Sequence, residues 1–360
     1  MTPRTEIDKD ALDQYLQRVT GGIAAGLNCA ISSLGDQLGL FQALHDLRIA
    51  SSQELADQTG LNERWLREWL RHQACMEQIE YDPDTDRFYL SPEAVAVMLD
   101  TQHPAYFGGG FESATASFNS LPGLVDSFRS GLGFTYDDHG PGCASGIERM
   151  SRYFNEHALV PKVLPLLDGV VDKLQRGARV ADVGCGAGVA TVAMAETFPE
   201  SEFIGYDISE HALTRARNHL GTVDVPNLRF VNPLEEMMPA EPTFDLITTF
   251  DVIHDAAHPQ PLLNAIFQAL KDDGTFLCED IRSFPSFQRN LEEHPLAGLL
   301  YGFSIMVCMS SSLSTADGAG LGTLGFNEEV AREMTGKAGF GRFRCLDFDN
   351  PMNNYYEVRK

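Results

Sequence analysis

Three glycines follow a predicted buried strand in RVADVGCGAGVAT, and their spacing is typical of a turn that wraps around a ligand. Gly184, Gly186 and Gly188 come directly after a strand that ends at Asp182, and a helix is predicted to begin at once. Glycine lets the backbone turn tightly and approach a ligand where a side chain would clash. A second mark lies in FIGYDIS, which puts Asp207 at the end of the next predicted strand. An acidic side chain there accepts hydrogen bonds from a ribose diol.

The same segment distinguishes between two nucleotide cofactors. A nicotinamide dinucleotide fingerprint, G-x-G-x-x-G, needs Gly or Ala where this chain has Val189. Asp182, just before the glycines, does not suit a pyrophosphate. It suits a cationic ligand, such as the amino group and sulfonium of S-adenosylmethionine. The sequence therefore favours S-adenosylmethionine, the alternative being an ordinary strand–turn–helix corner without a ligand.

A histidine follows the fourth predicted strand in FDVIHDAAHP. His254 thus lies just past the carboxyl end of that strand, the edge at which parallel sheets bind ligands. Methyl transfer from a sulfonium is an in-line displacement, and a phenolic acceptor with a pKa near ~10 must also lose a proton. An imidazole that acts as general base contributes about 10²–10⁴-fold. The alternative is a histidine that caps a helix or packs in the core.

Composition narrows the class of protein. The formal net charge of -24 argues against a general nucleic-acid or membrane-surface binder, because so acidic a chain repels phosphates. The first residues show no secretory signal, and no apolar run is long enough to span a bilayer. Seven scattered cysteines without a C-x-x-C pair suit free thiols in the cytoplasm. We therefore expect a cytoplasmic protein with no metal site and no membrane segment.

The elements that must hold these residues alternate between strand and helix in the C-terminal half. Such alternation predicts a mostly parallel sheet with helices on both faces. Two late segments, RFRCLDFD and NNYYEVRK, predict a closing antiparallel pair, and PKVLPLLDGVVDKLQRG predicts one amphipathic helix before the sheet. The predicted strands are 179–184, 202–207, 228–231, 244–250 and 274–281, and the helices 188–198, 209–220 and 259–270.

The N-terminal part has a different pattern. Residues 10–50 have helical spacing with predicted breaks at Gly35 and Gly39, and two short helices and an acidic hairpin turn at Asp82 follow. Helix–turn–helix followed by a hairpin is the winged-helix pattern. We expect a winged-helix domain at 1–100, a helical cover over a substrate pocket at 101–158, and a cofactor-binding α/β domain at 159–360.

The motifs VADVGCGAG, GYDIS and FDLITTFDVIHD together resemble the class I S-adenosylmethionine-dependent methyltransferases. With the winged helix in front, the chain is similar to small-molecule O-methyltransferases, which implies a Rossmann-like sheet and a homodimer paired through the N-terminal domains. The resemblance also implies that Asp182 and the glycine loop lie near the methionine moiety and that Asp207 contacts the ribose. Further cofactor contacts are predicted for Ile208, Asn232, Phe250 and Asp251.

In phenolic O-methyltransferases the position of His254 carries an HD pair whose histidine is the general base. Glu279, at the end of the fifth strand in FLCEDI, resembles the carboxylate that orients that histidine, and Asp280 is next to it. His254, Glu279 and Asp280 are therefore the predicted catalytic residues. Aromatic residues between 106 and 136 are candidates to contact the acceptor, namely Phe107, Phe111 and Tyr136.

Two alternatives stay open. A thioether acid of the methylthio-hydroxybutyrate type needs no base, because a sulfur lone pair attacks the methyl and nothing is deprotonated. A S-adenosylmethionine-sensing transcriptional regulator would use Arg64, Arg67 and Arg71 to meet DNA phosphates. Against it, residues 1–100 carry 8 Lys and Arg against 17 Asp and Glu, so nucleic acid is not an expected partner.

Overall fold

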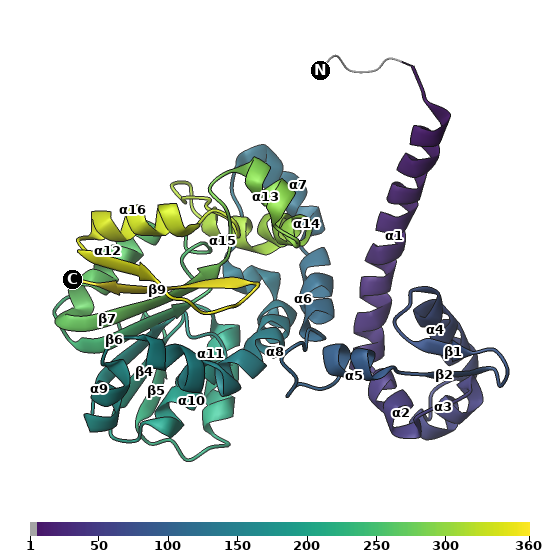
Figure 1. Ribbon diagram of the computed structural model, residues 1–360, viewed down its shortest axis with the longest axis horizontal. Coiled ribbons are helices and arrows are strands. Elements are labelled where there is room, and N and C mark those ends of the chain that lie inside the picture. The colour runs from purple at the N-terminus through teal and green to yellow at the C-terminus, as the bar shows by residue number, and fades with distance from the viewer. Residues whose placement is uncertain (1–5) are drawn as a thin grey trace. The chain divides into compact units, whose positions relative to one another are not determined.

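The computed structural model describes residues 6–360 and divides the chain into two compact units (Figure 1). Unit 1 ends at Thr115 and unit 2 begins at Ala116. The segment predicted as a pocket cover, 101–158, is thus split between them. None of the described helices combines the length and the hydropathy that crossing a lipid bilayer requires.

Unit 1 has the predicted winged-helix pattern. Gly39 adopts a positive φ of 68° and ends the first long helix, whereas Gly35 lies inside that helix. Ser51 begins α3 with a capping box, accepting from the Glu54 amide while the Glu54 side chain accepts from Ser51. The elements are α1 (Lys9–Gln37), α2 (Leu40–Leu47), α3 (Ser52–Thr59), α4 (Glu63–Cys75), β1 (Glu80–Asp82), β2 (Arg87–Tyr89), α5 (Pro92–Met98) and α6 (Gly109–Phe118).

The core of unit 1 joins the end of α1 to α4. The Trp69 ring fills the space over Gly35, where a Cβ would lie 2.5 Å from a ring carbon, and its indole nitrogen donates to the Ile31 carbonyl at 3.2 Å. Beside it, Gln73 bonds to Asn28 and Ser32 in a buried polar set. This packing covers only the C-terminal part of α1, and in Figure 1 the rest of the helix extends beyond α2–α5.

Unit 2 is built on a seven-stranded sheet in the order β5-β4-β3-β6-β7-β9-β8. Its first five strands pair in parallel, and β9 is antiparallel to both of its neighbours, as the sequence predicts. Strand order reverses between β3 and β6, which makes the carboxyl ends of these strands the expected ligand crevice. The strands are β3 (Arg179–Val183), β4 (Glu202–Tyr206), β5 (Leu228–Val231), β6 (Phe244–Phe250), β7 (Leu270–Ile281), β8 (Arg342–Cys345) and β9 (Asn353–Arg359).

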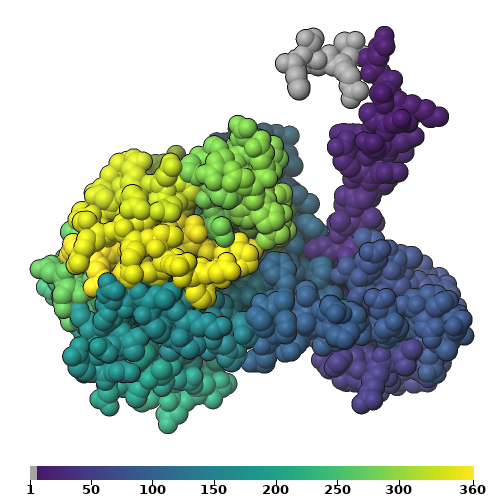
Figure 2. Space-filling model, in the orientation of Figure 1, coloured from purple at the N-terminus to yellow at the C-terminus, as the bar shows by residue number. Residues whose placement is uncertain are grey.

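Helices cover both faces of this sheet (Figure 1). One buried cluster lies between the sheet and α9 and α10, and a second lies between the sheet and α12 and α16. The α-helices of unit 2 are α7 (Leu121–Ser130), α8 (Pro141–His157), α9 (Val170–Arg176), α10 (Val189–Thr197), α11 (Glu210–Leu220), α12 (Pro259–Ala269), α13 (Phe287–Glu293), α14 (Ala297–Phe303), α15 (Met309–Ser312) and α16 (Glu328–Ala338). In Figure 2 the α13–α15 segment, in light green, lies beside the yellow C-terminal segment on the surface of unit 2.

Four short helical turns complete unit 2, and in this unit one predicted helix was wrong. The single helix predicted over PKVLPLLDGVVDKLQRG is interrupted, because Gly169 adopts a left-handed φ of 70° and only α9 follows it. The turns are η1 (Tyr136–His139), η2 (Leu159–Val163), η3 (Leu164–Leu166) and η4 (Ser304–Cys308).

Candidate functional site

The glycine loop connects β3 to α10 at the carboxyl edge of the sheet. Gly188 has a φ of 74°, and a Cβ on it would lie 2.3 Å from the Phe230 ring, so glycine is required for packing. Gly184 donates to the Tyr206 carbonyl at 2.7 Å. A Cβ on Gly186 would meet nothing within 4 Å, which leaves this part of the loop open on its outer side. A ligand can therefore approach the backbone at Gly186.

Asp207 holds the loop from the neighbouring strand. Its two carboxylate oxygens accept from the amides of Gly186 at 2.7 Å and Ser209 at 2.8 Å. Burial raises the pKa of Asp207, although these amide bonds oppose the shift. Each oxygen keeps a second lone pair, so the carboxylate can still accept from a ligand hydroxyl.

Asp182 is fully buried behind the loop. Its carboxylate accepts from the Thr191 hydroxyl at 2.5 Å and from the Thr248 hydroxyl at 2.9 Å. Burial raises its pKa to about 6. In this arrangement the Asp182 side chain bonds β3 to α10 and to β6. Any influence of Asp182 on a cationic ligand would therefore act through the position of the glycine loop.

The other predicted cofactor residues lie along the same edge. Asn232 follows β5 and donates to Glu210 at 2.6 Å, while its carbonyl oxygen accepts from the Leu234 amide. Ile208 is 63% exposed, so its side chain is available for an apolar contact with a flat ligand. Phe250 ends β6 and packs against the cluster under α10. Their contacts with a cofactor stay predictions.

His254 is held between two carboxylates just after β6. Its Nδ1 lies 2.6 Å from Asp280 Oδ1, and its Nε2 lies 3.1 Å from Asp255 Oδ1. The imidazole is only 2% exposed, and Asp280 is fully buried. Burial alone would lower the pKa of His254, but Asp280 and Asp255 outweigh it and hold that pKa well above its ordinary value. These two carboxylates therefore favour the charged form of the ring.

Of the two carboxylates predicted to orient His254, Asp280 contacts it. Successive residues of β7 point to opposite faces of the sheet, and Glu279 bonds instead to the Tyr355 hydroxyl on β9. Burial, reinforced by Asp251, raises the pKa of Glu279 well above its ordinary value. Asp251 accepts from Asn353 at 2.6 Å, and burial and Asp280 raise its pKa to about 7. Burial and the neighbouring Asp251 thus favour the uncharged form of Glu279.

Two residues that sequence reasoning missed, His139 and Cys308, come from η1 and η4. Within η1, the predicted acceptor residue Tyr136 lies in electrostatic range of both Asp207 and Asp255, and the buried His139 lies in range of Asp255. Burial lowers the pKa of His139, so this second imidazole is neutral. Cys308, in η4, hydrogen-bonds to His254. The only signal in the sequence was the Y-D-D-H run of η1, which lies in a segment without periodicity.

Hydrogen bonds of Asp137 and Ser312 anchor η1 and the Gly/Ser-rich segment 309–325 to the site. Asp137 accepts from the Ser209 hydroxyl and, at 3.0 Å, from the Glu210 amide at the start of α11. Ser312 donates to the Ala256 carbonyl at 2.9 Å, so α15 is fastened to the loop that carries His254. The predicted acceptor residues Phe107 and Phe111 belong to unit 1, where Phe111 packs against the winged-helix core.

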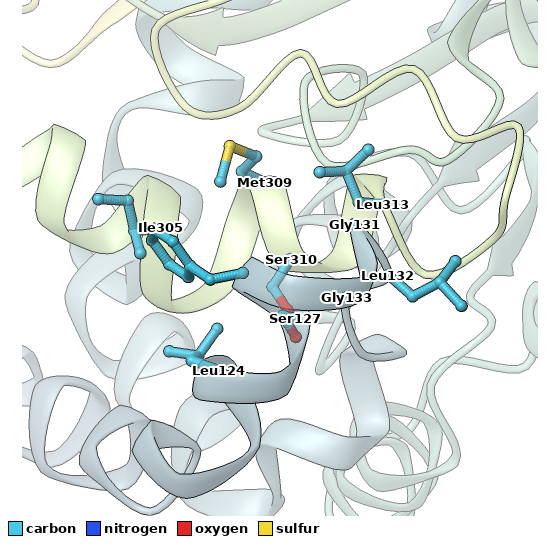
Figure 3. A pocket seen from close by; sticks show the side chains of 10 residues that line it. Leu124, Ser127, Gly131, Leu132, Gly133, Ile305, Met309, Ser310 and Leu313 are labelled. Carbon is cyan, nitrogen blue, oxygen red and sulfur yellow. The ribbon is translucent and has the colours of Figure 1, made fainter.

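A small apolar pocket of about 130 Å³ lies between α7 and the η4–α15 segment (Figure 3). Leu124, Ile305 and Met309 line it, and the side chains drawn around it are almost all apolar. None of the predicted site residues lines this pocket, which has no groups for acid–base chemistry.

Comparisons with known proteins identify both parts of the chain. Residues 174–311 match the model of a methyltransferase domain, and residues 25–100 match that of a winged helix-turn-helix domain typified by Rv2258c. The ubiquinone biosynthesis O-methyltransferase of Neisseria meningitidis serogroup C is 31% identical over 132 residues, 36% of this chain and 54% of that protein. The chain thus spans about half the length of the curated relatives it matches.

Solved structures share the whole architecture. Human N-acetylserotonin methyltransferase, solved in complex with S-adenosylmethionine, has a TM-score of 0.69 at 16% identity and covers 99% of each chain. The mitomycin 7-O-methyltransferase has a TM-score of 0.69 at 17% identity, covering 98% of this chain and 100% of that one. These likenesses confirm the predicted fold, a Rossmann-like sheet behind a winged helix.

Thr248 and the next residue on β6 allow a matched test of the Asp182 bonds. Thr248→Val keeps the shape but removes a donor to a buried carboxylate, and we expect it to lower the free energy of unfolding by about 1–3 kcal/mol. Thr249→Val is the control, because the buried Thr249 hydroxyl has no nitrogen or oxygen partner among the described residues. We expect it to change stability by less than about 1 kcal/mol in urea denaturation. Equal losses in both variants would contradict the role given to Asp182.

Proposed function

Because the chain carries a methyltransferase domain behind a winged helix-turn-helix domain, we propose that it is a S-adenosylmethionine-dependent methyltransferase that methylates a hydroxyl of a small molecule. The observation that carries the proposal is that a possible cofactor site and a possible base lie at the same edge of the sheet. The glycine loop with Asp207 could hold a nucleoside, and the His254–Asp280 pair lies beyond the next strand. Curated relatives and similar structures named as O-methyltransferases support the hydroxyl as acceptor.

The residues of the loop fit the cofactor. S-adenosylmethionine supplies an electrophilic methyl carbon on a sulfonium. The open side of Gly186 admits a ligand to the backbone, and Asp207 has lone pairs left for a ribose diol. The exposed Ile208 offers an apolar contact for the adenine. The acidic residues around this edge favour a cationic sulfonium over an anionic pyrophosphate.

The proton of a hydroxyl acceptor would go to His254. Asp280 fixes the ring through Nδ1, so Nε2 is the atom that accepts. The raised pKa makes His254 a stronger base once deprotonated, but it also lowers the fraction of the ring that is deprotonated at a given pH. The hydroxyl proton is taken up at Nε2 beside Asp255, which stabilises the imidazolium that forms.

This raised pKa also favours a second candidate. A thioether acceptor attacks the methyl without losing a proton, so an imidazolium does not hinder it. S-methylation of a thioether acid would then depend on orientation and exclusion of water alone.

A DNA-reading role for the winged helix has less support. On α4, Arg64 and Arg67 are paired with Glu68 and Glu63 at 2.5 and 2.6 Å. Their charges are therefore already compensated within the helix. The seven cysteines all lie within the described residues and form no disulfide with one another, and this supports the cytoplasm as the compartment.

Dimerisation through unit 1 is the proposed role of the N-terminal domain. Leucine, valine and isoleucine side chains at three- and four-residue intervals make one exposed apolar face of α1, formed by Leu12, Leu16, Val19, Ile23 and Leu27. An apolar face of this length on a soluble protein marks an interaction surface. A second copy of the chain is the proposed partner, because two such faces are complementary to each other.

Asp207→Ala tests the cofactor site. We expect it to weaken binding of S-adenosylmethionine by at least about 10-fold in isothermal titration calorimetry, since charge-assisted hydrogen bonds contribute about 1.5–3 kcal/mol. Asp224→Ala, an exposed carboxylate in the loop before β5, is the control and should bind as wild type does. Unchanged affinity in Asp207→Ala, with normal folding by circular dichroism, would show that the cofactor lies elsewhere.

His254→Ala tests the base. With methyl-labelled S-adenosylmethionine and pooled phenols and thioether acids, mass spectrometry identifies the labelled product. We expect O-methylated product, reduced about 10²–10⁴-fold in rate by the substitution. A labelled sulfonium whose formation keeps most of its rate in His254→Ala would instead establish the thioether alternative.

The doubly substituted variant Leu16→Glu/Ile23→Glu tests the dimer. Wild-type protein should have twice the 39.6 kDa chain mass in multi-angle light scattering, and this variant the single mass, because four charges would be buried in the paired face. Gln14→Glu/Gln17→Glu adds the same charge at exposed polar positions of α1 and should stay dimeric. A monomeric wild type would end the proposal.

A further inference from the structure

Beside the predicted base lies a group of three different ligand types. One ring nitrogen of His254, one carboxylate oxygen of Asp255 and the Cys308 sulfur lie within 4.8 Å of one another, and His254 Nε2 is 3.1 Å from Asp255 Oδ1. They come from the loop after β6 and from η4, which is more than fifty residues further along the chain. Imidazole, carboxylate and thiolate are the three side-chain groups that bind Zn²⁺ in proteins.

The surroundings of this group match those of a metal-binding histidine. Such a histidine usually donates its other ring N–H to a carboxylate, which fixes the tautomer and directs the free nitrogen at the metal. Here Nδ1 lies 2.6 Å from the fully buried Asp280, while Nε2 lies 3.1 Å from Asp255 Oδ1 and Cys308 hydrogen-bonds to the same ring. Apart from His254, the described residues offer the buried Asp255 Oδ1 no hydrogen-bond partner.

We propose that His254, Asp255 and Cys308 form a binding site for a divalent transition-metal ion of the Zn²⁺ type. Binding forms one bond each from Nε2, Oδ1 and the sulfur to the ion, and the protons on Nε2 and on the thiol pass to solvent. Three protein ligands leave a fourth position for water or a ligand atom. The thiol selects Zn²⁺ over Mg²⁺ or Ca²⁺, which prefer oxygen. The sequence predicted no metal site, because these residues share no spacing motif.

A second carboxylate set competes for the same histidine. Asp251, His254 and Asp280 also bring their ligand atoms within 4.8 Å of one another, but they use Nδ1 and include no thiol. Nδ1 is already bonded to Asp280, whereas Nε2 lies beside the Asp255 oxygen, and Cys308 bonds to the same ring. The Nε2 set is therefore the one that the geometry favours.

The consequence for activity rests on the proposed function. Zn²⁺ on Nε2 would occupy the atom that accepts the proton of a hydroxyl acceptor. The metal-loaded protein should therefore lose base-dependent methyl transfer while it still binds S-adenosylmethionine. The site would thus act as an inhibitory metal site at the proposed base.

Co²⁺ is the probe, because it reports on the ligands by absorption. Full-length protein is freed of metal with a chelator, returned to chelator-free buffer and titrated with Co²⁺ in the absence of S-adenosylmethionine and acceptor. We expect visible bands together with a near-ultraviolet thiolate-to-Co²⁺ band, all displaced by one equivalent of Zn²⁺. Cys308→Ser should lose the thiolate band, and Asp280→Asn should weaken Co²⁺ binding about 10- to 100-fold.

Cys345→Ser, which removes an exposed thiol on β8, is the matched control and should keep the full spectrum. His254→Asn should abolish binding, which keeps the test decisive if Cys308→Ser fails to fold by circular dichroism. No thiolate band in wild type, a band that survives in Cys308→Ser, or Co²⁺ bound without a thiolate band would each overturn the proposal. Because the readout involves no methyl transfer, failure here is separate from failure of the proposed function.

Discussion

Two hydroxyl groups that bond to the buried carboxylate of Asp182 hold the centre of unit 2 together. Thr191 belongs to α10 and Thr248 to β6. The Asp182 side chain on β3 therefore joins its own strand to α10 and to β6, the strand on the other side of the topological switch. A buried carboxylate without these donors would cost several kcal/mol. The glycine loop begins directly after this residue, and its position therefore depends on the same bonds. The same bonds hold β3 and β6 together at the point where the strand order reverses.

Around His254 the balance of charge differs from that of an ordinary histidine base. Asp280 and Asp255 flank the ring, while Asp251 and Glu279 lie behind them with raised pKa values. Burial favours the neutral form of each carboxyl group, and their mutual repulsion adds to it. One positive ring among several acidic groups is the arrangement with the least unpaired charge. A proton and a metal ion at Nε2 would each supply positive charge among these acidic groups. The base and the metal-site proposals therefore involve the same atom.

Much of this architecture was predictable because its signals are local. Alternating strand and helix patterns gave the strands to within a few residues, and the glycine loop and Asp207 are encoded in short motifs. The choice between Glu279 and Asp280 was not predictable, since a one-residue shift on β7 moves a side chain to the other face of the sheet. His139 and Cys308 were missed because they lie in short irregular turns, η1 and η4, whose sequences have no period. The interruption at Gly169 shows that a helical pattern alone does not exclude a left-handed residue within it.

The anchoring of η1 on the start of α11 has a consequence for how the two halves of the site communicate. Asp137 accepts hydrogen bonds from the Ser209 hydroxyl and the Glu210 amide at the start of α11. Ser209 is two residues beyond Asp207, whose carboxylate bonds to the glycine loop. Tyr136 and His139 of the same turn lie in electrostatic range of Asp255. A shift of the β4–α11 corner must therefore carry η1 with it. If a ligand in one half of the site moves this corner, thermodynamic reciprocity requires that the two ligands change each other's affinity by the same factor.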